Sequence, residues 1–416
     1  MPDQEAGAPL PGQPRIVTRL EALWQIAHGP GGGADRPAFS LAEAQAMLLV
    51  AGWAREAGLS PGVDRHGNLW ALPADWTGPL VSAGSHVDTV PDGGRYDGAL
   101  GTVLGLELAH ELRNGTAAGA RPALLICAAE EAPRFGAGTI GSRLLVGALS
   151  PDALEDMHDA DGMTAAQAKA GYLEALGELA RIEPPVARVL AHTEIHVAQR
   201  LSLREIGVVT RVASPRRSEI ELVGRAGHSG EVSMEDRRDA LAAASEVVLA
   251  VERAARAEPP ETVATVGTLA VSPGALSVIP ARVRLGLDAR GIDSTSLRRL
   301  DAAISAAVTE IAERRGVEAL VRLLRAGEPV TLDGELARAA QEVARGHGIA
   351  ATETWSGAGH DAQHLNALMP ALLLFVPLHG GESHTPFEQA DPTDISHAAL
   401  IANEVLDAVA ARRPWS

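Results

Sequence analysis

The sequence has very few cysteines and lysines, and these shortages bound its environment and its partners. Cys127 is the only cysteine among 416 residues, so no internal disulfide can form and the chain fits a reducing compartment. Its place in the apolar run ALLICAAE indicates a small buried hydrophobe. Lys169 is the only lysine, and the formal net charge of −17 argues against nucleic acid or an anionic membrane surface as a partner.

Long apolar runs are also missing. No stretch reaches the about 18 apolar residues that a membrane-spanning helix requires. Residues 1–17 lack the basic start and the apolar centre of a signal peptide. Together with the single cysteine, these absences predict a cytoplasmic protein without a membrane segment. The hydrophobic share of 46% is typical of a globular chain rather than a disordered one.

The order of the expected helices and strands predicts two domains, one inserted into the other. Residues 210–325 read as strand, helix, two strands, helix and strand, which is typical of a ferredoxin-like α+β domain. The flanking residues 1–209 and 326–416 alternate helices with apolar strands, as in a doubly wound α/β catalytic domain with a mixed sheet. Within the first segment, Ser40 and Glu43 match a capping box at a helix start.

The first candidate site residues lie in the stretch SAGSHVDTVPDGGRYDG. His86 and Asp88 are two positions apart, so in an extended chain they point to the same side. Asp97 follows a loop rich in proline and glycine that brings the chain back, and Gly98 comes directly after it. A histidine and an aspartate at this spacing are common by chance. The pattern therefore gains weight only from further ligand-type residues downstream.

Three later strand ends supply such residues. Glu130 and Glu131 follow the run ALLICAA, where open α/β sheets place their chemistry, although an isolated pair of glutamates usually marks a solvated turn. In AHTEIHVAQ, His192 and His196 share one strand face. His192 fits a core histidine equally well, and His196 is the stronger candidate. His384 lies in the loop after the buried run PALLLFVPL.

Collected together, these residues form a ligand set for metal ions. Three imidazoles and two carboxylates suit two divalent ions, zinc, manganese, cobalt or nickel, bridged by one carboxylate; the set is His86, Asp97, Glu131, His196 and His384. Asp88 is then placed to accept the far N–H of His86 and fix its tautomer. Glu130 is placed to take a proton from the water that such a pair of ions activates.

Seven stretches between about residue 15 and the C-terminus resemble one family: GSHVDTVPDGGRYDGALG, EEAPRFGAGTIGS, EIHVAQ, GRAGHSGEVSMEDRRDA, DAR, SGAGHDAQ and FVPLHGGESHTPFE. The chain is similar to the co-catalytic metal aminoacylase and carboxypeptidase superfamily. Within it, the chain resembles the N-carbamoyl-L-amino-acid hydrolase, beta-ureidopropionase and allantoate amidohydrolase group. The resemblance implies a homodimer with two divalent metal ions that hydrolyses a non-peptide carbon–nitrogen bond of a small molecule.

The resemblance also implies how the ligands divide. His86 and His196 would share one ion with Asp97, and Glu131 and His384 would hold the other with Asp97.

Further roles are implied for residues around the ions. Glu130 would be the general base. His228, in the inserted lid and dimerisation domain, would reach the active site of the partner subunit and stabilise the oxyanion. Arg290 would bind the substrate carboxylate, for which its planar fork is suited. Gln199 and His360 would line the substrate pocket.

Several substrate-contacting positions depart from the group's usual pattern. HIEQGP is replaced by HVAQRL, with Ala198 and Arg200 in place of Glu and Gly, and GHAGTTPM appears as GHSGEVSM. Ser277 stands where the group usually has an asparagine that helps to bind the substrate carboxylate. The metal and base positions match the pattern. The sequence therefore predicts hydrolysis of an N-carbamoyl amino acid, with two alternatives open: an N-acyl-amino-acid amidohydrolase or dipeptidase, and a non-catalytic binding protein that retains the fold.

Overall fold

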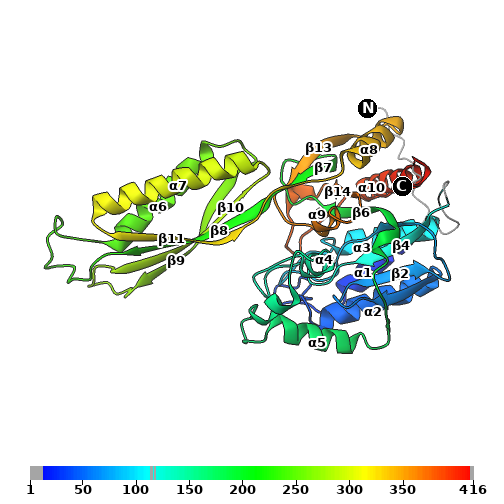
Figure 1. Ribbon diagram of the computed structural model, residues 1–416, viewed down its shortest axis with the longest axis horizontal. Coiled ribbons are helices and arrows are strands. Elements are labelled where there is room, and N and C mark those ends of the chain that lie inside the picture. Colours follow the sequence, from blue (N-terminus) through cyan, green and yellow to red (C-terminus); the bar gives the residue numbers. More distant parts are fainter. Residues whose placement is uncertain (1–12, 113–115, 117–118, 413–416) are drawn as a thin grey trace. The chain divides into compact units, whose positions relative to one another are not determined.

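The computed structural model describes residues 13–112, 116 and 119–412 (Figure 1). Most of the N-terminal segment assessed for a signal peptide lies outside the described residues. The chain divides into two compact units. Unit 1 comprises residues 1–210, 331–354 and 359–416, and unit 2 comprises residues 211–330 and 355–358. No helix in the described part of the chain is long and apolar enough to cross a membrane.

Unit 1 is a mixed α/β structure built on a large sheet. The described residues form ten strands in the order β12-β7-β14-β6-β3-β4-β2-β1-β5, with β13 paired to β7. β14, β6, β3 and β4 run parallel to one another, whereas β1, β2 and β7 pair antiparallel with neighbours. The bounds are β1 (Leu59–Val63), β2 (Leu69–Pro73), β3 (Leu80–Ala83), β4 (Arg121–Ile126), β5 (Ala180–Arg181), β6 (Val189–Val197), β7 (Ile206–Val212), β12 (Val330–Thr331), β13 (Ala351–Ser356) and β14 (Ala371–Val376).

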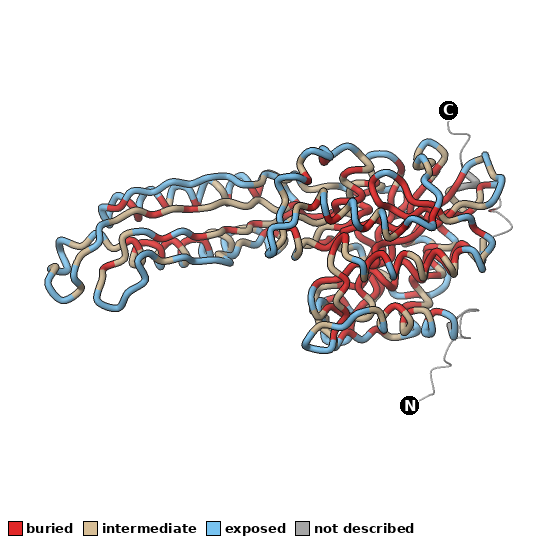
Figure 2. The backbone as a smooth tube through the Cα atoms, turned by 90° about the horizontal axis from the view of Figure 1, so that it is seen from below, coloured by how far each residue is buried: buried red, intermediate tan, exposed pale blue. Residues whose placement is uncertain are grey.

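Both faces of this sheet are covered. Alternate residues of β4 belong to different apolar clusters: Leu124 and Ile126 lie in the larger one, and Ala123 and Leu125 lie in the smaller one. This alternation is what a strand buried on both faces requires, and Figure 2 shows the buried residues gathered through unit 1. The helices are α1 (Gln13–Trp24), α2 (Leu41–Glu56), α3 (Ala99–Glu111), α4 (Ile140–Leu145), α5 (Ala165–Ala175), α8 (Gly334–Gly346), α9 (Asp361–Leu365) and α10 (Pro392–Arg412), with short 3₁₀ turns at Pro151–Glu155, Val186–Arg188 and His379–Gly381.

Unit 2 has four antiparallel strands and two helices in the order β8-α6-β9-β10-α7-β11. The strands lie in the order β11-β8-β10-β9, and apolar residues of α6 and α7 form one core with them. This is the split βαβ arrangement of ferredoxin-like structures. The bounds are β8 (Ser214–Val223), α6 (Ala240–Arg256), β9 (Val263–Ser272), β10 (Arg282–Gly291), α7 (Ser294–Arg315) and β11 (Glu318–Ala326).

The observed division differs from the one expected from the sequence at three places. Residue 210 belongs to unit 1, and residues 326–330 and 355–358, expected in the catalytic domain, belong to unit 2. For residues 355–358 the reason is backbone pairing, because Ala213 N–H donates to the carbonyl of Ser356 at 2.7 Å. Arg290 Nη1 also donates to the carbonyl of Gly357 at 3.0 Å.

Candidate dinuclear metal centre

Side chains from separate strand ends form two ligand groups that share Asp97. The first ligand group is His86, Asp97 and His196, and the second ligand group is Asp97, Glu131 and His384. Asp97 Oδ1 lies 3.5 Å from His86 Nε2 and 3.3 Å from His196 Nε2. Asp97 Oδ2 lies 3.2 Å from His384 Nε2, which is 3.5 Å from Glu131 Oε1. One carboxylate thus presents one oxygen to each group, the geometry of a bridging ligand.

The parallel strands explain why these residues meet. β3, β4, β6 and β14 run in one direction, so their carboxyl ends lie along one edge of the sheet, where open α/β sheets bind ligands. His86 follows β3, Glu131 follows β4, His196 lies at the end of β6 and His384 follows β14. Asp97 comes from the loop that leads into α3.

The spacing of the donor atoms fits divalent ions. Ligands of a tetrahedral ion with bonds of about 2.0–2.1 Å lie about 3.3 Å apart. The Nε2 atoms of His86 and His196 are 3.3 Å apart. His86 Nδ1 donates to the backbone carbonyl of Asp88, and His196 Nδ1 donates to that of Val197, each at 3.1 Å. Both Nε2 lone pairs are therefore left for a metal, and the second-sphere hydrogen bonds that fix a ligating imidazole are present.

The charge balance of the centre also favours cations. Burial raises the pKa of Glu131 to about 7, and the Asp97 carboxylate adds to this rise. Burial also raises the pKa of Glu130 well above its usual value; His86 opposes the rise and Glu131 adds to it. Burial would raise the pKa of Asp97 too, but the three surrounding imidazoles hold it well below its usual value. Carboxyls that disfavour one another's ionisation indicate a shortage of positive charge, which divalent ions would supply.

Glu130 lies beside the first ligand group. Its Oε2 is 3.7 Å from His86 Nε2, and the residue is 9% exposed. Glu131 is a member of the second ligand group and contacts His384 within it. Consecutive carboxylates therefore serve different groups, as the alternation of an extended chain predicts. A water bound next to His86 would lie within reach of Glu130, which is the position that a general base requires.

The His86 ring lies closer to the backbone carbonyl of Asp88 than to its carboxylate, so the expected contact between the ring and that carboxylate stays a prediction. His86 Nδ1 donates to the backbone carbonyl of Asp88, while the carboxylate Oδ1 is 3.5 Å away. The two carboxylate oxygens accept the backbone N–H groups of Glu130 and Glu131 at 3.1 and 2.9 Å. Asp88 therefore fixes the loop that carries both glutamates.

Gln199 and Glu388 connect the parts of the second ligand group. Gln199 Nε2 donates to Asp97 Oδ2 at 3.0 Å and lies 3.0 Å from His384 Nε2. Glu388, for which the sequence analysis predicted no role, accepts the backbone N–H of Asp97 and that of His384, each at 3.2 Å. It also accepts the Ser383 hydroxyl at 3.0 Å. The sequence signal that could have indicated this role is the position of Glu388 four residues after His384, in the stretch FVPLHGGESHTPFE.

The other histidines on β6 and α9 differ in their relation to the centre. His360 stacks edge-on against His196, with ring centroids 4.6 Å apart, and forms a third group of ligand-type side chains with His196 and Glu194. His192 belongs to none of these groups within the described residues. It is 1% exposed and lies 2.9 Å from the Ser82 hydroxyl, so it is a core histidine.

Three predicted site residues belong to unit 2. His228 and Ser277 are exposed and lie on neighbouring segments, because a β-bridge joins His228 to Val278. Arg290, at the end of β10, donates from Nε and Nη2 to Asp288 at 3.3 and 3.2 Å.

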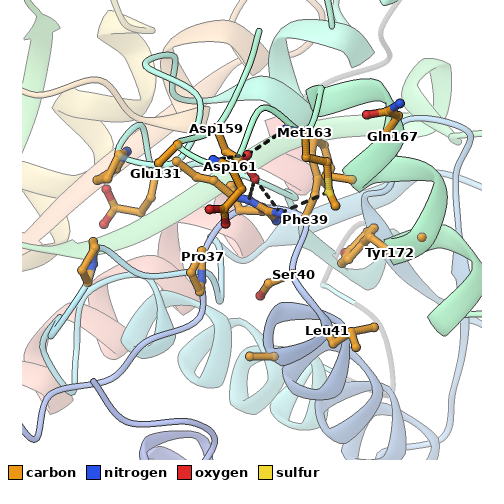
Figure 3. A pocket seen from close by; sticks show the side chains of 18 of the residues that line it. Pro37, Phe39, Ser40, Leu41, Glu131, Asp159, Asp161, Met163, Gln167 and Tyr172 are labelled. Carbon is orange, nitrogen blue, oxygen red and sulfur yellow. Dashed lines mark hydrogen bonds and ion pairs between the residues drawn. The ribbon is translucent and has the colours of Figure 1, made fainter. Parts of the chain in front are cut away.

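A cavity of about 780 Å³ lies in unit 1 beside the second ligand group (Figure 3). Figure 3 shows Glu131 at one end of the cavity and Gln167 and Tyr172 at the other. Phe39 and Met163 line the cavity with apolar side chains between these two ends. A concave, largely apolar space with a few polar groups is typical of a small-molecule site.

Comparison with known proteins identifies the family. Residues 83–408 match the model of Peptidase family M20/M25/M40, and the chain belongs to this family. An N-carbamoyl-L-amino acid amidohydrolase from Geobacillus stearothermophilus is 34% identical over 398 residues, which cover 93% of this chain and 96% of that protein. An allantoate amidohydrolase from Bacillus subtilis is 31% identical over 397 residues, which cover 94% of this chain and 96% of that protein.

A solved structure supports the same placement. An amidase of the hydantoinase/carbamoylase family from Burkholderia multivorans has a TM-score of 0.83 and 32% sequence identity, with 96% of this chain and 98% of that chain covered. These findings confirm the resemblance inferred from the motifs. Each of these three relatives is named as an amidohydrolase or an amidase.

Proposed function

We propose that this chain is a dinuclear-metal amidohydrolase that cleaves the carbamoyl group from an N-carbamoyl (ureido) amino acid. The observation that carries the proposal is the pair of ligand groups sharing Asp97, with Glu130 beside the first. Imidazole and carboxylate ligands suit zinc, or manganese, cobalt or nickel. The curated relatives named as carbamoyl amino acid and allantoate amidohydrolases support the substrate class.

The metal ions and the residues around them have separate roles in the proposed hydrolysis. Two divalent ions, when bound, supply Lewis acidity and a water of lowered pKa. Glu130 accepts the proton of the attacking water and delivers it to the leaving nitrogen, so that one residue serves as base and then as acid. Gln199, which donates to Asp97, holds the bridging carboxylate in place. A carbamoyl substrate then yields the amino acid, ammonia and carbon dioxide.

Unit 2 is proposed as a lid and dimerisation domain. Arg290 would bind the substrate carboxylate with the help of Ser277, and His360 would line the pocket. His228 of the partner subunit would stabilise the oxyanion. Closure of the lid would exclude water from the site.

Dimerisation is supported by the edge of the unit 2 sheet. β11 is an edge strand, and its Leu320, Leu323 and Leu324 are 52%, 53% and 60% exposed. A long apolar edge strand is a surface on which a second chain can pair. We therefore propose a homodimer formed through unit 2.

Two other functions remain as alternatives. Ser277, in place of the usual asparagine, favours an altered carboxylate site, which would suit an N-acyl-amino-acid amidohydrolase or dipeptidase. A non-catalytic binding protein that retains the fold is the second alternative.

A substrate screen separates these functions. Protein loaded with zinc, manganese, cobalt or nickel is given ureido acids, N-acyl amino acids and dipeptides, with chelated protein as the control. Release of ammonia and carbon dioxide supports the proposal, release of a carboxylic acid supports the acylase alternative, and release of an amino acid from dipeptides supports the dipeptidase. Absence of turnover with every metal contradicts all three enzymes.

Glu130→Gln tests the proposed base. The amide cannot accept a proton, so we expect kcat to fall by about 10²–10⁴-fold. Metal content should stay at the wild-type level, because Glu130 is in neither ligand group. Glu342→Gln, at an exposed position of α8, makes the same charge change as a control. Unchanged kcat in Glu130→Gln would remove Glu130 from the mechanism.

A further inference from the structure

Three consecutive backbone amides under the metal centre donate to buried carboxylates. Ala129 N–H donates to Glu43 Oε1 at 2.8 Å, and Glu130 and Glu131 N–H donate to the two oxygens of Asp88 at 3.1 and 2.9 Å. The segment Ala128–Glu131, here called the glutamate loop, therefore has its amide side held by two acids. These acids come from α2 and from the loop after β3.

The opposite side of the glutamate loop is held as well. The carbonyls of residues 128, 129 and 130 accept the backbone N–H groups of residues 141, 140 and 139 at 2.9, 2.9 and 2.7 Å. Ala129 has a left-handed backbone with φ of 55°, which costs about 1–2 kcal/mol for a residue with a Cβ. Such a conformation persists only where its surroundings determine it, and the amide of that same residue is the one bound by Glu43.

Glu43 does more than cap its helix. Ser40 caps α2 by accepting Glu43 N–H at 3.1 Å, and Glu43 Oε2 accepts the N–H of Phe39 as in a capping-box-like turn. The other carboxylate oxygen of Glu43, Oε1, accepts the backbone N–H of Ala129. Glu43 as a whole is 0% exposed. Burying a carboxylate is costly unless it is hydrogen-bonded and compensated. Burial raises the pKa of Glu43 well above its ordinary value and Asp88 adds to the rise, while the hydrogen bonds from the N–H groups of Ala129 and Phe39 oppose it. Arg36, also buried at 1% exposure, interacts electrostatically with Glu43 and Asp88.

We propose that Glu43 is a positioning residue of the metal centre, which holds the glutamate loop so that Glu131 meets the second ligand group and Glu130 faces the first. The inference rests on the proposed dinuclear function. Because Glu131 is a member only of the second ligand group, Glu43 acts unequally on the two ions. The first ligand group takes its imidazoles from the loop after β3 and from the end of β6, and none of its members belongs to the glutamate loop.

Glu43→Gln tests this asymmetry. Glutamine keeps the shape of the side chain and one acceptor oxygen, but its NH₂ group would face a backbone N–H. One of the two hydrogen bonds from backbone N–H groups is therefore lost. Metal-free protein is titrated with zinc against a chromophoric chelator, and His384→Ala identifies the ion held by the second ligand group. We expect affinity for that ion to fall by about 10–100-fold, the usual effect of losing an outer-sphere partner, with the other ion changed by less than about threefold.

A matched control separates positioning from loss of stability. Val50→Ala, on the same helix and 0% exposed, removes core volume without touching the glutamate loop's hydrogen bonds. We expect it to lower the melting temperature without separating the two zinc affinities. Equal weakening of both ions in Glu43→Gln, or no weakening of either, overturns the inference alone. Wild-type protein that binds fewer than two ions overturns the inference and the proposed function together.

Discussion

His192 is a buried neutral imidazole on the same strand as ligand His196. Burial lowers its pKa to about 3, and the Ser82 hydroxyl 2.9 Å away is its hydrogen-bond partner. In the unfolded chain the same group has a pKa of about 6.5. Above that value both states are neutral and His192 gives no pH dependence. Between about pH 6.5 and 3 the unfolded state binds a proton that the folded state refuses, so stability falls as the pH falls.

His192→Gln should remove this contribution. Glutamine can still bond to Ser82, and it does not titrate. We expect the free energy of unfolding of the wild type, measured by urea denaturation, to fall by up to about 1.4 kcal/mol more per pH unit below pH 6.5 than that of the variant. His28→Gln, at an exposed position, is the control. Parallel pH profiles of wild type and His192→Gln would show that His192 is protonated in the folded protein.

At the residue scale, the sequence indicated ligand-type side chains but not their supports. His86, Asp97 and His384 could be proposed because their types and loop positions suit a metal. The contacts of Asp88 and Glu43 to the glutamate loop could not, because hydrogen bonds to backbone amides leave no pattern in side-chain identity. Glu43 matched a capping box in the sequence, and its second oxygen has no local signal at all.

At the scale of elements, Gly98 links the start of α3 to the first ligand group. It precedes Ala99 with φ of 64° and ψ of −49°, a region that favours glycine. A Cβ at this position would lie 2.4 Å from atoms of the His86 ring. The loop that delivers Asp97 can therefore pass against His86 only because residue 98 has no side chain.

Gly98→Ala should displace His86 as well as strain the backbone. We expect loss of the ion held by the first ligand group and a lower melting temperature, measured by zinc titration and thermal unfolding. Gly58→Ala is the control, because Gly58 has φ of 81° but open space around its Cβ position. It should cost only the backbone strain, about 1–2 kcal/mol, and leave zinc binding intact. Full zinc affinity in Gly98→Ala would contradict the proposed contact.

Element types were easier to predict than their pairing. The strand runs before His86, Glu131 and His384 could be recognised as apolar segments ending in polar loops. Their neighbours in the sheet could not, since β3 pairs with β6 and β6 with β14 across long stretches of chain. The helix and strand order of unit 2 followed from local periodicity, whereas its antiparallel register and the grouping of residues 355–358 depend on contacts distant in sequence.

At the scale of the whole molecule, the proposal requires two chains for one complete site. The ligand groups and Glu130 lie in unit 1, and the proposed oxyanion group, His228, lies in unit 2. If His228 serves the partner subunit, each active site combines unit 1 of one chain with unit 2 of the other. A symmetric dimer then contains two such composite sites.

Mixing two inactive variants tests this arrangement. Glu130→Gln and His228→Ala homodimers each have two defective sites. A heterodimer has one site with both defects and one site with neither, because the intact Glu130 of one chain meets the intact His228 of the other. Co-expression in equal amounts should therefore restore about a quarter of wild-type turnover, with half of the dimers mixed. A monomer by light scattering, or no activity above the separate variants in proven heterodimers, would show that His228 does not act across the interface.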